Sequence, residues 1–115
     1  MLTWCEIDPD ALEHNIRALR SHVGSQTLLA PAVKSNGYGH GTLIAARAFL
    51  RGGADWLCVH QVSEARRLRE AGLTCPLYVF GPITLDEVPE VISLDLRAVV
   101  YGIAHIERYA SLASR

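Results

Sequence analysis

The residues with the clearest capacity for chemistry lie in the stretch 31–41, which reads PAVKSNGYGHG. Lys34 follows an apolar run, residues 28–33, and precedes glycines at every second position, with Tyr38 and His40 between them. An apolar run that ends on a lysine and then breaks into glycine is typical of a buried strand that presents an amine at its carboxyl end. The lysine is therefore the first candidate for a reactive group.

Two roles are open to Lys34 at this position. Burial beside apolar strands would lower its pKa and free the amine as a nucleophile, which can form an imine with a carbonyl substrate or with pyridoxal phosphate. The alternative is an ordinary lysine that leaves the sheet for solvent. Position and composition alone leave both roles open.

The glycines and the two residues between them admit a similar choice. Glycine lets the backbone turn tightly and approach a ligand closely, so residues 39–41 ahead of a helix could present amides to an anion. The alternative is a plain strand-to-helix turn, because the stretch is neither a P-loop nor the dinucleotide-binding fingerprint. Tyr38 offers a hydroxyl to phosphate or substrate, or else packs as an ordinary aromatic residue, and His40 is expected to be structural.

Alternating strand and helix signals surround this stretch. Asp8 and Pro9 form an N-cap and first-turn pair that predicts the start of a helix. A short strand over residues 3–7 is expected before it, and Pro89 is expected to break or kink the helix that starts near Thr84. Strands are predicted to begin near Leu29, Asp55, Leu77 and Arg97, and helices over 9–22, 42–51, 62–71 and 105–113 as well as from Thr84.

This alternation predicts an α/β fold with a parallel sheet and right-handed crossovers, in which the carboxyl ends of the strands form one rim. His60, Gln61 and Ser63 would share that rim with Lys34, whereas Glu64 is interpreted as an exposed carboxylate at a helix start. Two architectures fit the pattern. One is an open doubly wound sheet, and the other is part of a (β/α)8 barrel, which needs roughly 200 residues or more.

Composition limits the classes of function. The chain has 115 residues, half of them hydrophobic, and a net charge of -1, which favours one globular domain over residues 1–115 and argues against nucleic-acid or membrane partners. Acidic residues come too early for a signal peptide. Three widely spaced cysteines favour a reduced, cytoplasmic setting, and the five scattered histidines give no support for a metal site.

The stretch 31–41 closely resembles the cofactor-attachment signature of bacterial alanine racemases, in which an apolar strand ends in Val-Lys and Tyr-Gly-His-Gly follows. Softer matches flank it at residues 6–15, 53–57 and 64–72, so the resemblance covers nearly the whole chain. Ser35 and Gly37 stand where alanine is common in the family. Both residues are small, and the changes are interpreted as tolerated.

The resemblance implies a partial TIM-type barrel of about four βα units that binds pyridoxal 5'-phosphate. By analogy, Lys34 holds the cofactor covalently and also moves the alpha proton on the D face of alanine. Tyr38 would donate a hydrogen bond to the cofactor phosphate. The implied function is interconversion of L-alanine and D-alanine, which supplies D-alanine for the cell wall.

The same resemblance implies that several parts of the site lie outside residues 1–115. In the family, the opposite-face base is a tyrosine from a C-terminal β-domain of the partner subunit, so the full-length form is expected to be a homodimer with a shared active site. Later segments also supply an arginine and most of the phosphate cup. The strand at residues 3–7 would join that β-domain. The chain is therefore expected to be an N-terminal fragment with negligible activity alone.

Alternatives remain within the fold type and outside it. Amino-acid decarboxylases and a non-catalytic pyridoxal phosphate carrier have similar Ala-Val-Lys strands but do not share Tyr-Gly-His-Gly. A different class of function is a non-enzymatic fragment that binds cofactor weakly or serves in assembly. Half a barrel leaves two open sheet edges and uncovered apolar faces, which predicts self-association or marginal stability.

Overall fold

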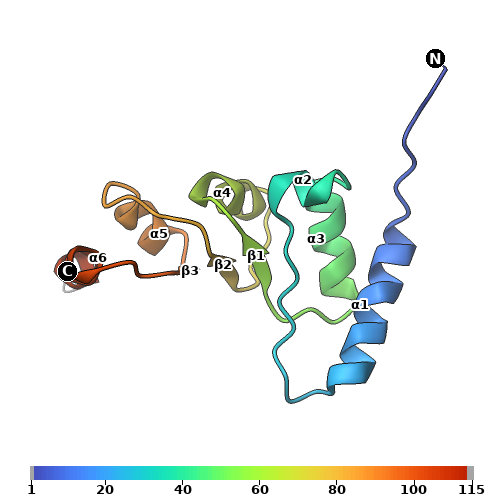
Figure 1. The fold of residues 1–115 in the computed structure, drawn as a ribbon, viewed down its shortest axis with the longest axis horizontal. Coiled ribbons are helices and arrows are strands. Elements are labelled where there is room, and N and C mark those ends of the chain that lie inside the picture. The colour runs from blue at the N-terminus through green and yellow to red at the C-terminus, as the bar shows by residue number, and fades with distance from the viewer. Residues whose placement is uncertain (1, 114–115) are drawn as a thin grey trace.

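The computed structural model describes residues 2–113. Its elements follow one another in chain order from α1 at one end of the molecule to α6 at the other (Figure 1). Helices and strands alternate after the second helix, as the sequence pattern predicts. The elements are α1 (Pro9–Val23), α2 (Lys34–Tyr38), α3 (Thr42–Arg51), β1 (Leu57–Val59), α4 (Val62–Glu70), β2 (Leu77–Val79), α5 (Val88–Ser93), β3 (Leu96–Ala98) and α6 (Ile103–Ala113).

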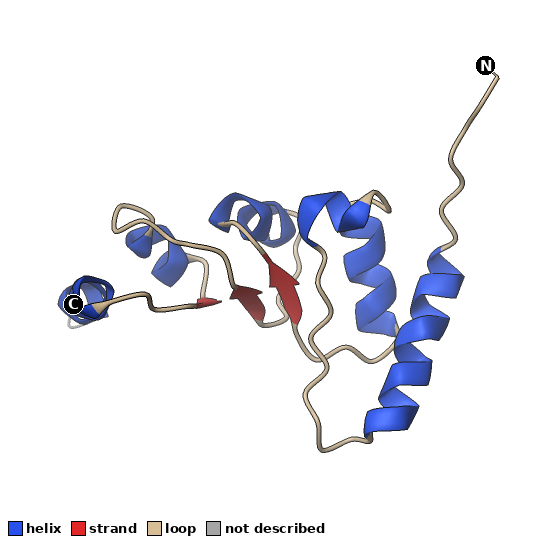
Figure 2. Cartoon of the chain, in the orientation of Figure 1, coloured by secondary structure: helices blue, strands red, loops and turns tan. Residues whose placement is uncertain are grey.

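The three strands form an open parallel sheet in the order β1-β2-β3 (Figure 2). Leu57, Leu77 and Leu96 stand in register across it. The apolar run ahead of Lys34 runs beside β1 but contributes only one bridge, between Ala32 and Cys58. The prediction of four parallel strands is therefore confirmed for three of them. The first is an extended segment that is hydrogen-bonded to β1 and to the two residues before it without forming a regular strand.

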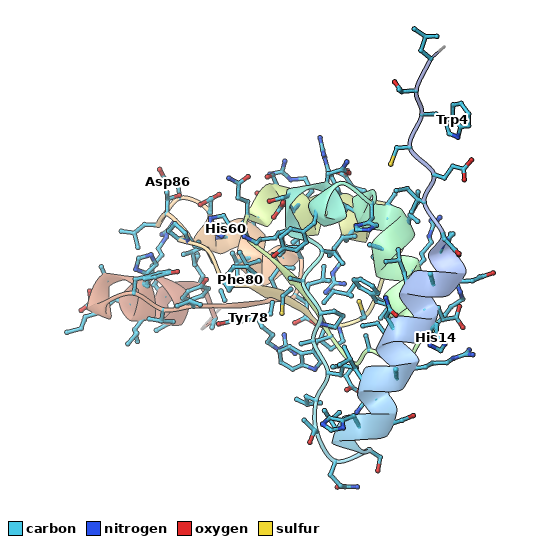
Figure 3. The ribbon with its side chains drawn as sticks, turned by 45° about the vertical axis from the view of Figure 1, so that its right-hand side comes forward. Trp4, His14, His60, Tyr78, Phe80 and Asp86 are labelled. Carbon is cyan, nitrogen blue, oxygen red and sulfur yellow. The ribbon has the colours of Figure 1, made fainter. Side chains whose placement is uncertain are left out.

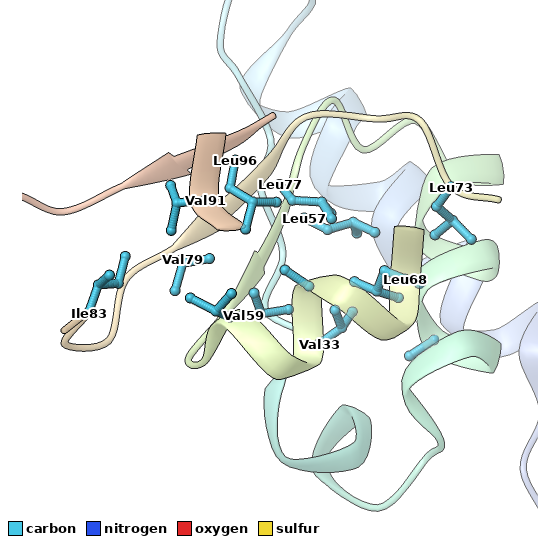
Figure 4. Packing of buried hydrophobic residues seen from close by; sticks show 14 residues of the cluster. Val33, Leu57, Val59, Leu68, Leu73, Leu77, Val79, Ile83, Val91 and Leu96 are labelled. Atoms are coloured by element: carbon cyan, nitrogen blue, oxygen red, sulfur yellow. The ribbon is translucent and has the colours of Figure 1, made fainter. Parts of the chain in front are cut away.

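The hydrophobic core lies between the sheet and its helices (Figure 4). One face of each of the first two strands is fully buried, while the middle residues, Cys58 and Tyr78, are only half-buried on the other face. Ala65 and Leu68 on α4 complete the core from the helix side. The largest fully buried strand and strand-end side chains are Val33, Leu57, Val59, Leu77 and Val79.

The first helix confirms its sequence signals. An Asp8 carboxylate oxygen accepts hydrogen bonds from the backbone N–H groups of Asp10 and Ala11 at 3.0 and 3.1 Å, which satisfies donors that an uncapped helix leaves unpaired. The helix stops at Gly24, whose φ is 78°. Helix α1 packs against α3, and Arg20 on α1 forms an ion pair with Asp55 ahead of β1.

Two predictions about irregular segments are wrong. Residues 3–7 form no strand, because no strand lies beside them to accept their hydrogen bonds; this segment projects from the body (Figure 1), with the Trp4 side chain 71% exposed. Pro89 does not break a helix. Helix α5 begins at Val88, so the proline lies in the first turn, where its missing N–H costs nothing.

The last helix packs less fully than its pattern predicts. Helix α6 has no buried residue, and Ile103 and Ile106 are 74% and 56% exposed. Tyr109 is half-buried against the core as expected. Among residues 2–113, no helix is both long and apolar enough to cross a membrane.

Candidate functional site

The lysine predicted from the sequence lies where the parallel strands end. Its amine nitrogen Nζ is 5.6 Å from the centroid of the Tyr38 ring and 5.7 Å from the centroid of the Phe80 ring. Phe80 directly follows β2, so residues from two strand ends meet here. Lys34 is also the single lysine of the whole sequence.

The amine has aromatic neighbours rather than a charged partner. Lys34 forms no ion pair with any of residues 2–113, and ring faces at about 6 Å stabilise a cation only weakly. The Tyr38 side chain is 61% exposed, and its hydroxyl makes no hydrogen bond to another described residue. The amine of the half-buried Lys34 and the ring of the exposed Tyr38 therefore lie side by side.

The segment after Lys34 winds in the left-handed sense. Ser35, Asn36 and Gly37 have φ/ψ values of 53°/50°, 56°/40° and 61°/35°, and Tyr38 has a φ of 54°. An L-residue in this conformation costs about 1–2 kcal/mol, so the three residues other than glycine together store roughly 3–6 kcal/mol of strain. Strain of this kind persists only where surrounding contacts impose it, and it gathers at functional sites.

Hydrogen bonds within the segment close this turn. The Gly37 N–H donates to Val33 O at 3.0 Å, and the Gly41 N–H donates to Asn36 O at 2.8 Å. His40 contributes its ring nitrogen Nδ1, 2.9 Å from Gly37 O, which agrees with its expected structural role. The N–H groups of residues 39–41 all donate within the turn. These hydrogen bonds favour the plain strand-to-helix turn over an arrangement that presents amides to an anion.

Glu64 is the residue whose role the sequence reasoning missed. Its Oε1 accepts the Ser35 N–H at 2.8 Å, and its Oε2 accepts the N–H groups of His60 and Gln61 at 2.8 and 3.0 Å. Burial acts to raise the pKa of this carboxyl, but the three backbone N–H donors outweigh it, so the pKa lies below its ordinary value. Glu64 is thus not the exposed carboxylate that was expected.

Phe80 is the second residue that the sequence reasoning missed. Its ring lies 5.6 Å from the His60 ring and 6.4 Å from the Tyr78 ring, centroid to centroid, and these three aromatic residues line one side of the sheet (Figure 3). His60 was expected on the rim and lies there. The signal for Phe80 was available, since it ends the apolar run of the third predicted strand.

Other features near the turn show no comparable chemistry. A groove of about 510 Å³ lies behind it, between Asn36 and Thr42 on one side and Arg67 and Glu70 on the other, and Lys34 does not line it. Residues 2–113 contain no cluster of three or more histidine, cysteine or acidic side chains able to hold a metal ion.

The fold and the site define a parallel α/β chain that presents one lysine at the carboxyl ends of its strands. The chain belongs to the family described as alanine racemase, N-terminal domain, whose model matches residues 7–115. This result confirms the resemblance noted in the sequence. The three parallel strands and their helices match the N-terminal part of the alanine racemase barrel.

Curated relatives and solved structures agree on the family. The chain is 44% identical over 90 residues to an alanine racemase of Synechocystis sp., which covers 78% of the chain and 24% of that protein. It is 38% identical over 100 residues to one of Methanococcus maripaludis, covering 87% and 27%. Both proteins are therefore about four times as long as the part that matches.

Two solved structures are closely similar to the fold of this chain. Alanine racemase from E. faecalis is 35% identical with a TM-score of 0.87, covering 92% of this chain and 29% of that one. The enzyme from Bacillus anthracis, solved with bound L-Ala-P, is 31% identical with a TM-score of 0.89, covering 96% and 28%. The chain thus spans less than a third of the relatives it matches.

Proposed function

We propose that this chain supplies the cofactor-lysine part of an alanine racemase that uses pyridoxal 5'-phosphate. The observation that carries the proposal is the Lys34 amine, which has no ion-pair partner among residues 2–113 and lies near the Tyr38 and Phe80 rings, directly before a left-handed turn. Family membership supports the same reading.

The residues present fit an aldehyde cofactor that carries a phosphate. Covalent attachment needs an accessible amine, and Lys34 offers one. A planar ring next to that amine needs flat apolar neighbours, which Phe80 and Tyr38 provide. The Tyr38 hydroxyl, exposed and without a protein hydrogen bond in the described residues, is free to donate to a phosphate oxygen. Lys34 and Tyr38 are therefore the residues that would hold the group.

Each residue then has a distinct task in racemisation. Pyridoxal phosphate, when bound, supplies the electron sink that makes the alpha proton of an amino acid removable. Lys34 would accept or return that proton on one face of the alpha carbon. Phe80, whose ring centroid lies 5.7 Å from the amine, would limit the access of water to it. Alanine is the proposed substrate because the relatives are alanine racemases and one was solved with L-Ala-P.

The proposal extends beyond residues 1–115, which we propose to be a single domain, the N-terminal portion of the barrel. The second base and the remaining phosphate ligands would come from further segments, in a homodimer that shares its active sites. The product, D-alanine, would serve cell-wall synthesis in the cytoplasm. Racemisation by the 115-residue chain alone is expected to be negligible, and robust turnover by it would contradict this division of the site.

The test uses the single lysine. Wild-type chain and Lys34→Ala are each incubated with pyridoxal 5'-phosphate, followed by absorption spectroscopy, borohydride reduction and peptide mass mapping. We expect the band of the covalently bound cofactor and a reduced adduct on residue 34 in the wild type only. The N-terminal amine is the internal control for non-specific labelling. A band of equal strength in Lys34→Ala, or an adduct confined to the N-terminus, would refute the assignment of Lys34.

A further inference from the structure

The Glu64 carboxylate links two parts of the site that lie far apart in the sequence. Its Oε2 binds the N–H groups of His60 and Gln61, which lie just before its own helix α4. Its Oε1 reaches the N–H of Ser35, 29 residues earlier, at 2.8 Å. Helix capping alone explains the first two contacts and not the third.

The third contact acts on the backbone of the lysine. The N–H of Ser35 belongs to the peptide plane that joins Lys34 to Ser35, so a bond to that N–H restrains the ψ angle of Lys34 and the φ angle of Ser35. Ser35 is the first residue of the left-handed turn, with φ 53°. The bond therefore acts at the point where the chain changes hand, directly beside the reactive side chain.

A carboxylate suits this position better than any neutral group. An ionised carboxylate only accepts hydrogen bonds and has room for several donors, and bonds to it are about twice as strong as neutral ones. Glutamine would offer one oxygen and would turn an NH₂ group toward either Ser35 or the helix start. Aspartate would keep the charge but lose the length of one methylene group.

We propose that Glu64 is a positioning residue, which holds the left-handed turn in place and thereby directs the Lys34 amine toward its cofactor. The second part of the inference, that the turn directs the Lys34 amine toward a cofactor, rests on the proposed function. The first part, control of the turn by Glu64, stands on geometry alone. Glu64 does not touch the reacting atoms.

Two variants separate positioning from simple capping. Glu64→Asp keeps a carboxylate near His60 and Gln61, so it should still cap α4, but it is too short to reach Ser35. Glu64→Gln keeps the length and loses one acceptor. Glu87→Gln is the matched control, because Glu87 also accepts a backbone N–H ahead of a helix, that of Thr84 at 2.8 Å, in the next βα unit.

Three measurements are made on the wild-type chain and the three variants. Amide hydrogen exchange of Ser35, followed by NMR, reports the turn. The rate of pyridoxal 5'-phosphate capture by Lys34, read by borohydride trapping and mass spectrometry, reports the direction of the amine. Thermal unfolding reports the fold. Lys34 is the only lysine, so peptide mapping needs only to separate its adduct from one on the N-terminal amine.

Loss of a charge-assisted hydrogen bond corresponds to about tenfold or more in an equilibrium constant. We therefore expect Ser35 exchange in Glu64→Asp and Glu64→Gln to be about tenfold faster and capture about tenfold slower, with both within twofold of wild type in Glu87→Gln. Glu64→Asp should also unfold within a few degrees of wild type, so that slow capture cannot be ascribed to a lost fold.

The remaining outcomes contradict one proposal or the other. Unchanged Ser35 exchange in Glu64→Asp would overturn the inference outright. Faster exchange with unchanged capture would overturn the positioning role. No capture by the wild-type chain would overturn the proposed function, whereas the Ser35 exchange rates would still decide whether Glu64 controls the turn.

Discussion

Gly81 permits the loops after β1 and β2 to meet, and replacing it with alanine tests how tightly they pack. A Cβ atom at this position would lie 2.1 Å from the backbone oxygen of His60 and 2.7 Å from its ring nitrogen Nδ1. The ring can rotate away, but the backbone oxygen cannot. The His60–Gln61 peptide must therefore move, and the Gln61 N–H that it carries is one of the groups that Glu64 holds.

The expected cost follows from two opposing effects. Forcing a methyl group into a packed region costs about 1–3 kcal/mol, and backbone contact puts Gly81→Ala at the upper end. Alanine also lowers the entropy of the unfolded chain, which returns about 0.4–1 kcal/mol. The net loss in the free energy of unfolding is thus about 2 kcal/mol, which corresponds to about 8 °C in melting temperature for a chain of 115 residues.

The assay is urea denaturation followed by circular dichroism, with Gly102→Ser as the control. An added Cβ at Gly102 meets no atom within 4 Å, and serine is a favourable residue immediately before a helix, here α6. The control should therefore lie within about 0.5 kcal/mol of wild type or be slightly more stable. A Gly81→Ala chain as stable as the wild type would refute the close packing of the two loops.

Two further predictions concern the scaffold. The Leu29 N–H, and then the Arg20 guanidinium, lower the pKa of Asp55. The contribution of this carboxylate to stability is therefore present above the ordinary aspartate pKa of about 3.9 and is lost as the pH falls through the depressed folded value. Asp55→Asn should flatten the acid limb of a plot of melting temperature against pH, and an unchanged limb would contradict this. Arg69→Lys should lower the free energy of unfolding, measured by urea titration, by about 2–3 kcal/mol. An ammonium group cannot replace a planar guanidinium that donates to four backbone oxygens. A loss below about 0.5 kcal/mol would contradict this prediction. Those oxygens belong to Leu73, Cys75, Leu94 and Asp95.

Much of the fold could be predicted because its signals are local. Asp8 and Pro9 start α1, and Gly24 ends it, as their side-chain chemistry requires. The apolar runs of β1 and β2 lie in the parallel sheet that the alternation of elements predicts. Lys34 could be placed at the strand ends by the same reasoning.

The features that escaped prediction depend on contacts between distant segments. Asn36 before Gly37 is a weak local signal of left-handed backbone, but nothing local marks Ser35, and the carboxylate that holds Ser35 in place comes from another βα unit. Glu64 itself carries an ordinary helix-start pattern, so its second contact cannot be read from its neighbours. Residues 3–7 have the opposite problem, since a strand needs a pairing partner that local sequence does not supply.

The left-handed turn has a consequence for how this chain tolerates mutation. Ser35, Asn36 and Tyr38 are exposed, and exposed positions normally accept most substitutions. Here the backbone itself excludes valine, isoleucine and threonine, whose branched Cβ atoms clash in this region of φ and ψ. In a library that substitutes every position, this surface segment would therefore be as restricted as the core, while remaining permissive to glycine and asparagine. The backbone conformation therefore limits which residues can follow the lysine, independently of any requirement of the chemistry at the site.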